Sequence, residues 1–297
     1  MGNTEEINSM NIEKEKIKKS IILTDLDGTL LDHETYSFEK AKPALEKTQS
    51  AETPVVFVTS KTFAEVQPIQ KKMGLWGKEP FIVENGGAIL IPKKFTDLNL
   101  KDLPLDGTLL DEKEFWRLEF GKPYEIVRDI LKEAAAEVGV EVRGIGDMSA
   151  EEFAKDSGLS VEEAELAKKR MYQEGFKILT PEINRAEIAE KLKKAIIFRG
   201  YHMSAGGRYY QIMGSPAKIR AVTALKELFR IKYGNILCIG FGDAPADLEF
   251  LELCDEGYLL ANPKKAVAVD LTNKKNIKKI PEIGPEGWNK VVMEKLG

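Results

Sequence analysis

Five short, mostly apolar runs near the two ends of this chain show no alternation between apolar and polar residues. They lie at residues 21–24, 54–59, 81–83, 235–240 and 257–260. A strand that is apolar at every position is buried on both faces, as in a parallel sheet covered by helices. Between the runs, apolar residues recur three and four positions apart, as helices require. The sequence therefore predicts an α/β fold with a doubly wound parallel sheet.

The middle of the chain has a different pattern. A helix is expected over residues 124–138, and another begins at Ser160, which can form a capping box with Glu163. Residues 195–199 and 208–213 are expected to be strands on either side of a Gly206–Gly207 turn. This block therefore predicts a separate α+β unit.

After this block the first pattern returns. Ser215 and Pro216 are expected to open a helix whose inward face carries Ile219, Val222, Leu225 and Phe229. A chain of 297 residues is longer than one compact core usually needs. We expect a core domain that is interrupted by an insertion. The predicted parts are a polar N-terminal leader (1–19), the core (20–87 and 213–297) and the inserted domain (88–212).

The composition narrows the kinds of partner. The net charge of −4 and the pI of about 5.6 argue against binding of nucleic acid by phosphate neutralisation. No run approaches the roughly 20 apolar residues of a membrane span, and the leader lacks the apolar centre of a signal peptide. With two cysteines, Cys238 and Cys254, and two histidines, a zinc site is not expected. We expect a cytoplasmic protein that acts on a small molecule, without a membrane partner.

Carboxylates follow two of the predicted strands. Asp25 and Asp27 come directly after the first strand, and Asp243 follows the strand at 235–240. Because the carboxyl ends of parallel strands meet at one edge of a sheet, these side chains should lie close together. Mg²⁺ prefers oxygen ligands and usually keeps several waters, so two or three protein oxygens suffice. An EF-hand calcium loop is excluded, because Leu30 occupies the position that requires glycine.

Other residues fit the removal of a phosphate group, which requires neutralised oxygens, an in-line nucleophile and a proton donor. Lys218, in the first turn of its helix, could neutralise both the nucleophile and the phosphate. Asp247 lies four residues after Asp243 and can face it along a helix start. Thr59 ends the second strand, where its hydroxyl and the N–H groups from Ser60 onward could hold phosphate oxygens.

These segments together resemble the haloacid dehalogenase superfamily of phosphatases. The matching motifs are Asp25-Leu26-Asp27-Gly28-Thr29, Val58-Thr59-Ser60-Lys61, Lys218 and Gly242-Asp243-Ala244-Pro245-Ala246-Asp247. The resemblance implies a Rossmann-like core with a cap domain of the C2B type. It implies that Asp25 is the nucleophile, which forms an aspartyl-phosphate, and that Asp27 is the general acid/base. It also implies Lys218 as a catalytic lysine and a magnesium site formed by Asp25, Asp27, Asp243 and Asp247.

Within that superfamily, the chain resembles the mannosyl-3-phosphoglycerate phosphatases. The matching stretches are Tyr36-Ser37-Phe38, Val58 to Thr62, Phe81 to Ile89 and Gly206 to Gln211, with a partial match over Arg170 to Phe176. Such a substrate carries a carboxylate, a phosphate and sugar hydroxyls, which arginine, amide and carboxylate side chains recognise. The expected substrate-binding residues are Lys61, Asn85, Arg170, Glu174 and Arg208.

The resulting hypothesis is a Mg²⁺-dependent phosphomonoester hydrolase acting on mannosyl-3-phosphoglycerate or a related glycosyl-3-phosphoglycerate, in the synthesis of a compatible solute. Three enzymes on the same scaffold are alternatives: another sugar phosphatase, a nucleotide phosphatase or a sugar phosphomutase. A further alternative from a different class is a non-catalytic protein that binds a sugar phosphate. Magnesium-dependent release of phosphate from a generic ester separates this last alternative from the enzymes.

Overall fold

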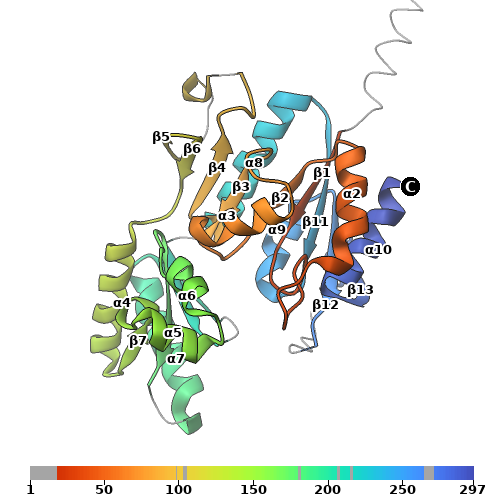
Figure 1. Cartoon of the computed structure of the whole chain (residues 1–297). Coiled ribbons are helices and arrows are strands. Elements are labelled where there is room, and N and C mark those ends of the chain that lie inside the picture. Colours follow the sequence, from red (N-terminus) through yellow and green to blue (C-terminus); the bar gives the residue numbers. More distant parts are fainter. Residues whose placement is uncertain are drawn as a thin grey trace, which may run out of the picture.

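The computed structural model describes residues 19–97, 99–102, 106–179, 182–205, 208–214, 217–263 and 271–297. Residues 1–18 of the predicted leader, the Gly206–Gly207 turn and the Ser215–Pro216 helix start lie outside these residues. The described chain forms two units, a larger one that contains both ends of the described chain and a smaller one formed by its middle part (Figure 1).

The larger unit is built on a parallel sheet. Every neighbouring pair of its strands is parallel, in the order β13–β12–β11–β1–β2. The strands are β1 (Lys19–Thr24), β2 (Val55–Phe57), β11 (Ile236–Gly242), β12 (Glu256–Ala261) and β13 (Ile277–Ile283). An isolated parallel bridge between Val58 and Ile82 connects this sheet to β3 (Phe81–Val83). The predicted parallel sheet is therefore confirmed, and β13 is a strand that the apolar runs did not indicate.

Successive residues of β1 face opposite sides of this sheet. Ile22 packs in a buried cluster with Trp288, whereas Ile21 and Leu23 pack in a second cluster with Phe229. Helices covering the first face are α2 (Lys42–Ser50), α3 (Phe63–Lys72) and α10 (Gly284–Leu296); those on the second are α8 (Ala217–Tyr233) and α9 (Leu248–Glu252). This two-sided burial is the reason why the strand is apolar at every position.

The inward face of α8 differs from the prediction at one position. Val222, Leu225 and Phe229 are fully buried, but Ile219 is 38% exposed. The buried face instead includes Lys218 and Ala221. Because successive residues of a helix are about 100° apart, Ile219 lies off the face that its neighbour Lys218 presents to the protein interior. No helix in the described part of the chain is long and apolar enough to cross a membrane.

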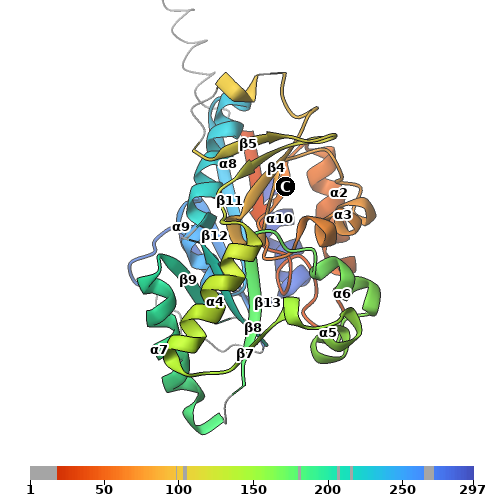
Figure 2. The ribbon, with the colours of Figure 1, turned by 90° about the vertical axis from the view of Figure 1, so that its left-hand side faces the viewer.

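The smaller unit is an antiparallel sheet with helices. Its strands, in the order β7–β8–β10–β9, are β7 (Val142–Gly144), β8 (Gln173–Ile178), β10 (Tyr210–Gly214) and β9 (Tyr201–Ala205). α4 (Tyr124–Val138) and α7 (Glu182–Phe198) lie side by side, and α5 (Ala150–Ser157) packs with α6 (Val161–Ala167) (Figure 2). The predicted α+β character of this block agrees with this arrangement.

One predicted strand, residues 195–199, is wrong. Residues up to Phe198 belong to α7, and the strand of this region is β9, which begins at Tyr201. Leu192, Ala195 and Ile196 are buried whereas Phe198 is 88% exposed, which is helical rather than alternating burial. Residues 195–198 are instead the last turn of α7.

Three strands beyond residue 87 extend the larger unit. β4 (Ala88–Pro92), β6 (Phe115–Glu119) and β5 (Thr108–Asp111) follow β3 in one antiparallel sheet. Ile89, Ile91 and Leu118 share a buried cluster with Val56 of β2. We therefore propose that the inserted domain, called the cap below, begins near Gly121 rather than at residue 88.

Candidate active site

The ends of β1 and β11 bring acidic residues to one edge of the parallel sheet. Thr24 and Phe241 are paired in register, and the N–H of Asp25 donates to the carbonyl of Phe241 at 2.9 Å. Asp243 follows directly after β11, and a short 3₁₀ turn (Pro245–Asp247) carries Asp247 back to the same place. The parallel register therefore determines this meeting of two distant segments.

Three carboxylates converge at this edge. Asp25, Asp243 and Asp247 each offer an oxygen that lies within 4.8 Å of the other two. Burial and the neighbouring Asp247 raise the pKa of Asp25 well above its ordinary value, and Lys218 opposes this effect only in part. Clustered carboxylate oxygens with uncompensated negative charge suit a hard divalent cation such as Mg²⁺. The donor set therefore fits the predicted metal.

Asp243 is held by side chains that the sequence analysis did not assign to the site. The amide of Asn262 donates to its Oδ2 at 2.6 Å, and the Thr29 hydroxyl lies 3.4 Å from its Oδ1 and 3.5 Å from Oδ2 of Asp25. Gly28 has φ of +82°, and a Cβ there would lie 2.4 Å from Oδ2 of Asp243. Asn262 follows the end of β12, so the strand-end rule that indicated Asp243 could also have found it.

Asp247 binds groups of the protein with both oxygens. Oδ2 accepts the N–H groups of Asp243 and Ala244 at 3.1 and 3.0 Å, and Oδ1 accepts Nζ of Lys218 at 2.9 Å. Burial disfavours the charged form of Lys218, but Asp247 and Asp25 outweigh it and raise the pKa of this lysine. Asp247 therefore shapes the loop and positions the lysine; that it also ligates a metal stays a prediction.

Asp27 lies beside this cluster and pairs with Lys61. Its Oδ2 is 2.9 Å from Nζ of Lys61, which also lies 5.2 Å from the ring centroid of Tyr36. The other carboxylate oxygen of Asp27, Oδ1, is buried and has no hydrogen-bond partner. Burial opposes the charge of Lys61, but Asp27 and Glu65 together raise the pKa of this lysine. Lys61, predicted to bind substrate, thus contacts the predicted general acid.

The segment predicted to bind phosphate runs from the end of β2 to the start of α3. Thr59 is 1% exposed, and its Oγ1 accepts the N–H of Lys61 at 3.1 Å. Thr62 then caps α3 by accepting the N–H of Glu65. The N–H of Thr62 in turn donates to the Glu65 carboxylate at 2.8 Å. Binding of phosphate by Thr59 and Ser60 therefore stays a prediction.

Two of the predicted cap residues lie on or next to β8. Glu174 is fully buried, accepts the Tyr124 hydroxyl at 2.7 Å and pairs with Nε of Arg128 at 3.2 Å. Burial raises its pKa, although Tyr124 and Arg170 oppose the shift. Arg170 differs, because its Nε and Nη1 are buried and have no hydrogen-bond partner. Its charge lies near the carboxylates of Glu84 and Glu174, where burial raises the pKa and Arg170 opposes the rise, and its role in binding substrate stays a prediction.

The other two predicted substrate-binding residues interact with the protein. Arg208 is exposed and donates to the carbonyl oxygens of Asp156 and Ser157, within the cap. The Asn85 amide donates to the Gln173 and Gln211 side chains at 2.9 and 3.0 Å. Neither contact tests substrate binding, and both roles stay predictions.

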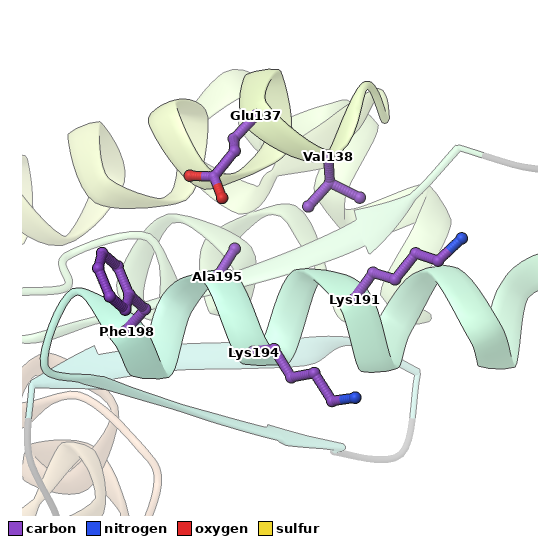
Figure 3. A pocket seen from close by; sticks show the side chains of 6 residues that line it. All are labelled: Glu137, Val138, Lys191, Lys194, Ala195 and Phe198. Atoms are coloured by element: carbon purple, nitrogen blue, oxygen red, sulfur yellow. The ribbon is translucent and has the colours of Figure 1, made fainter.

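A depression on the outside of the cap is unrelated to these residues. It lies between α4 and α7 and contains none of the predicted site residues (Figure 3). Its lining consists of Glu137, Val138, Lys191, Lys194, Ala195 and Phe198. The candidate catalytic residues lie instead at the edge of the core sheet.

A parallel core with clustered carboxylates and a buried lysine at the ends of its strands defines a phosphoryl-transfer type of α/β hydrolase. Residues 22–274 match the family model described as haloacid dehalogenase-like hydrolase, and the chain belongs to this family. The predictions of a superfamily member and of a phosphoric monoester hydrolase are confirmed by this match and by the relatives described next.

Two similar curated proteins are both named glucosyl-3-phosphoglycerate/mannosyl-3-phosphoglycerate phosphatase. The protein of Methanococcoides burtonii is 39% identical over 94% of this chain and 98% of its own length. That of Persephonella marina is 35% identical over 92% of this chain and 95% of its own length. A mannosyl-3-phosphoglycerate phosphatase of Pyrococcus furiosus is 30% identical over 87% of this chain and 98% of its own length.

Solved structures agree on the fold. A haloacid dehalogenase-like hydrolase from Bacteroides thetaiotaomicron aligns with a TM-score of 0.61 at 16% identity, covering 94% of this chain and all of its own. BT4131, described as a sugar phosphatase of subclass IIB, aligns with a TM-score of 0.57 at 15% identity, covering 93% of this chain and 98% of its own. The predicted core with an inserted α+β cap is therefore confirmed.

Proposed function

We propose that this protein is a Mg²⁺-dependent phosphatase of glucosyl-3-phosphoglycerate and mannosyl-3-phosphoglycerate that works through an aspartyl-phosphate on Asp25. The main support is the convergence of Asp25, Asp243, Asp247 and Lys218 at one edge of the sheet. The names of the relatives, which match nearly the whole chain, support the choice of substrate. We further propose that the enzyme works in the cytoplasm.

The proposed reaction has two displacements at phosphorus. An oxygen of Asp25 attacks the phosphorus, and the bond to the glycerate oxygen breaks while Asp27 donates a proton to that oxygen. Asp27 then takes a proton from water, whose oxygen attacks the phosphorus and releases inorganic phosphate and free Asp25. Lys61, 2.9 Å from Asp27, would hold its carboxylate in place.

The proposed reaction also requires positive charge that compensates the negative phosphoryl oxygens. The carboxylates of Asp25 and Asp243, with the backbone carbonyl of Asp27, would hold the magnesium ion, and Asp247 would orient the loop or add a ligand. When bound, the ion supplies positive charge that offsets the phosphoryl oxygens. Lys218 and the segment from Thr59 to Lys61 would hold the remaining oxygens.

A panel of phosphate esters tests this proposal. We expect magnesium-dependent phosphate release with the highest kcat/KM for the two glycosyl-3-phosphoglycerates, because they alone combine phosphate, carboxylate and sugar. Hexose phosphates and nucleotides, measured beside them, represent the alternative phosphatases. A nucleotide or simple hexose phosphate as the best substrate would reject the proposed specificity but keep the phosphatase.

Arg170 gives a more specific prediction. Its buried Nε and Nη1 have no hydrogen-bond partner in the protein and suit a substrate carboxylate, to which an arginine can bind with two hydrogen bonds. We expect Arg170→Gln to lower kcat/KM for glycosyl-3-phosphoglycerate by about 100-fold, since a buried charge pair is lost. Kinetics with a hexose phosphate, which lacks the carboxylate, should change little.

The matched control is Arg143→Gln. Arg143 also lies in the cap, but it pairs with Glu152 at 2.8 Å and is partly exposed. Its loss should leave both substrates unaffected. If Arg170→Gln lowers the rates of both esters equally, Arg170 has no role in recognition of the carboxylate.

A further inference from the structure

The turn between β3 and β4 has an unusual backbone. Glu84 and Asn85 have φ of +48° and +54°, although neither is glycine. Left-handed conformations are unfavourable for residues with a side chain and persist only where the surroundings hold them. The contacts of Glu84 and Asn85 therefore indicate which parts of the protein hold this backbone and what role the turn has.

On the core side, the turn is bound to the segment predicted to hold phosphate. The N–H of Glu84 donates to the carbonyl of Lys61 at 3.0 Å, and that of Asn85 to the carbonyl of Thr59 at 2.9 Å. Gly86 lies directly against the start of α8, where a Cβ would be 2.3 Å from the backbone nitrogen of Lys218. The turn thus contacts both elements that would hold the phosphate.

On the cap side, the Glu84 carboxylate holds the start of β8. It is 2% exposed and accepts the N–H groups of Met171, Tyr172 and Gln173 at 2.8 to 3.2 Å. Three backbone donors on one buried carboxylate fix the path of this segment. Arg170 and Glu174 stand at either end of it, so their positions depend on Glu84.

Asn85 connects the same turn to two cap strands. Both hydrogens of its amide are used, one by Oε1 of Gln173 on β8 and the other by Oε1 of Gln211 on β10. Gln173, fully buried, donates in turn to the carbonyl of Ser60 at 2.6 Å. The hydrogen bonds therefore form a closed ring from the phosphate-binding segment through the turn to the cap and back.

We propose that Glu84 and Asn85 are positioning residues that fix the cap relative to the phosphate-binding segment, so that Arg170 meets the far end of a substrate whose phosphate lies at Thr59. This inference rests on the proposed phosphatase function. It also changes the role expected of Asn85, because an amide whose two hydrogens are both bound within the protein acts on substrate through Gln173 and Gln211.

The deciding variant is Asn85→Gly. Glycine adopts the left-handed backbone without steric cost, so the turn is kept while the amide is removed. We expect kcat/KM for glycosyl-3-phosphoglycerate to fall by about tenfold or more, because two partly buried hydrogen bonds are lost. A small aryl phosphate, which does not reach the cap, should change by less than about threefold. Asn85→Ala should lose the same selectivity and be less stable than Asn85→Gly, because alanine does not favour the left-handed backbone.

Asn289→Ala is the matched control, because this asparagine also joins two elements, accepting the N–H of Ala44, but lies within the core. It should leave both rates unchanged. Amide hydrogen exchange adds a readout without substrate: Glu84→Gln should speed exchange at residues 171–173, which lose an ionic acceptor.

The proposal is overturned if Asn85→Gly keeps full activity on both esters or loses the two activities equally. If the panel selects another ester as the best substrate, the proposed function is wrong. The same comparison with that ester against the aryl phosphate then still decides the role of Asn85.

Discussion

Asp25→Asn is expected to abolish turnover, with kcat lowered by at least about 10⁴-fold, because an amide cannot attack phosphorus. Substrate should still bind, since the phosphate-binding segment and the cap are unchanged. Phosphate release measures the first effect, and titration calorimetry with magnesium present measures the second. A rate within about tenfold of the wild type would exclude the covalent route.

The same substitution should stabilise the protein when no metal is present. Burial and Asp247 raise the pKa of Asp25 in the folded state. A carboxyl group whose folded pKa exceeds its unfolded one disfavours folding at neutral pH, where the unfolded chain ionises it freely. Asparagine removes this charge, so the Tm in a chelator should rise. Asp32→Asn is the control, because Asp32 is partly exposed on the same loop and its carboxylate accepts hydrogen bonds from Thr35.

Removal of divalent metal is expected to have the second large effect, a loss of essentially all phosphate release. Three carboxylates within 4.8 Å of one another, with Lys218 bound to one of them, leave negative charge that would repel a phosphate dianion. Activity should return with Mg²⁺. It should not return with Ca²⁺, which takes more ligands at longer distances.

Thermal unfolding provides a readout of metal binding that does not depend on activity. Magnesium should raise the Tm of the wild type in a concentration-dependent manner, because it binds the folded state only. Asp243→Asn should weaken this response strongly, since it removes a carboxylate that Asn262 and Thr29 hold in place. Full activity in the presence of a strong chelator would contradict the metal site.

Local sequence was sufficient to predict the parallel core sheet and the acidic residues that follow its strands. Runs such as Ile21–Leu23 are apolar at each position because both faces of β1 are buried, and this pattern is visible without coordinates. A parallel sheet then requires Asp25 and Asp243 to end at the same edge. The strand predicted at residues 195–199 is wrong because this stretch is too short to show a period. A short apolar run at the end of a helix looks the same as a buried strand.

The sequence by itself therefore determined the parallel core, the class of chemistry and the edge at which Asp25 and Asp243 meet. Only the tertiary structure decided which partners hold those groups: Asn262 on Asp243, Lys61 on Asp27, and the turn of Glu84 and Asn85 on the cap. The physical reason is the separation along the chain of the residues that interact. Burial periodicity acts between neighbours in the chain, whereas Asn85 and Gln211 are 126 residues apart and their contact depends on how two finished units pack.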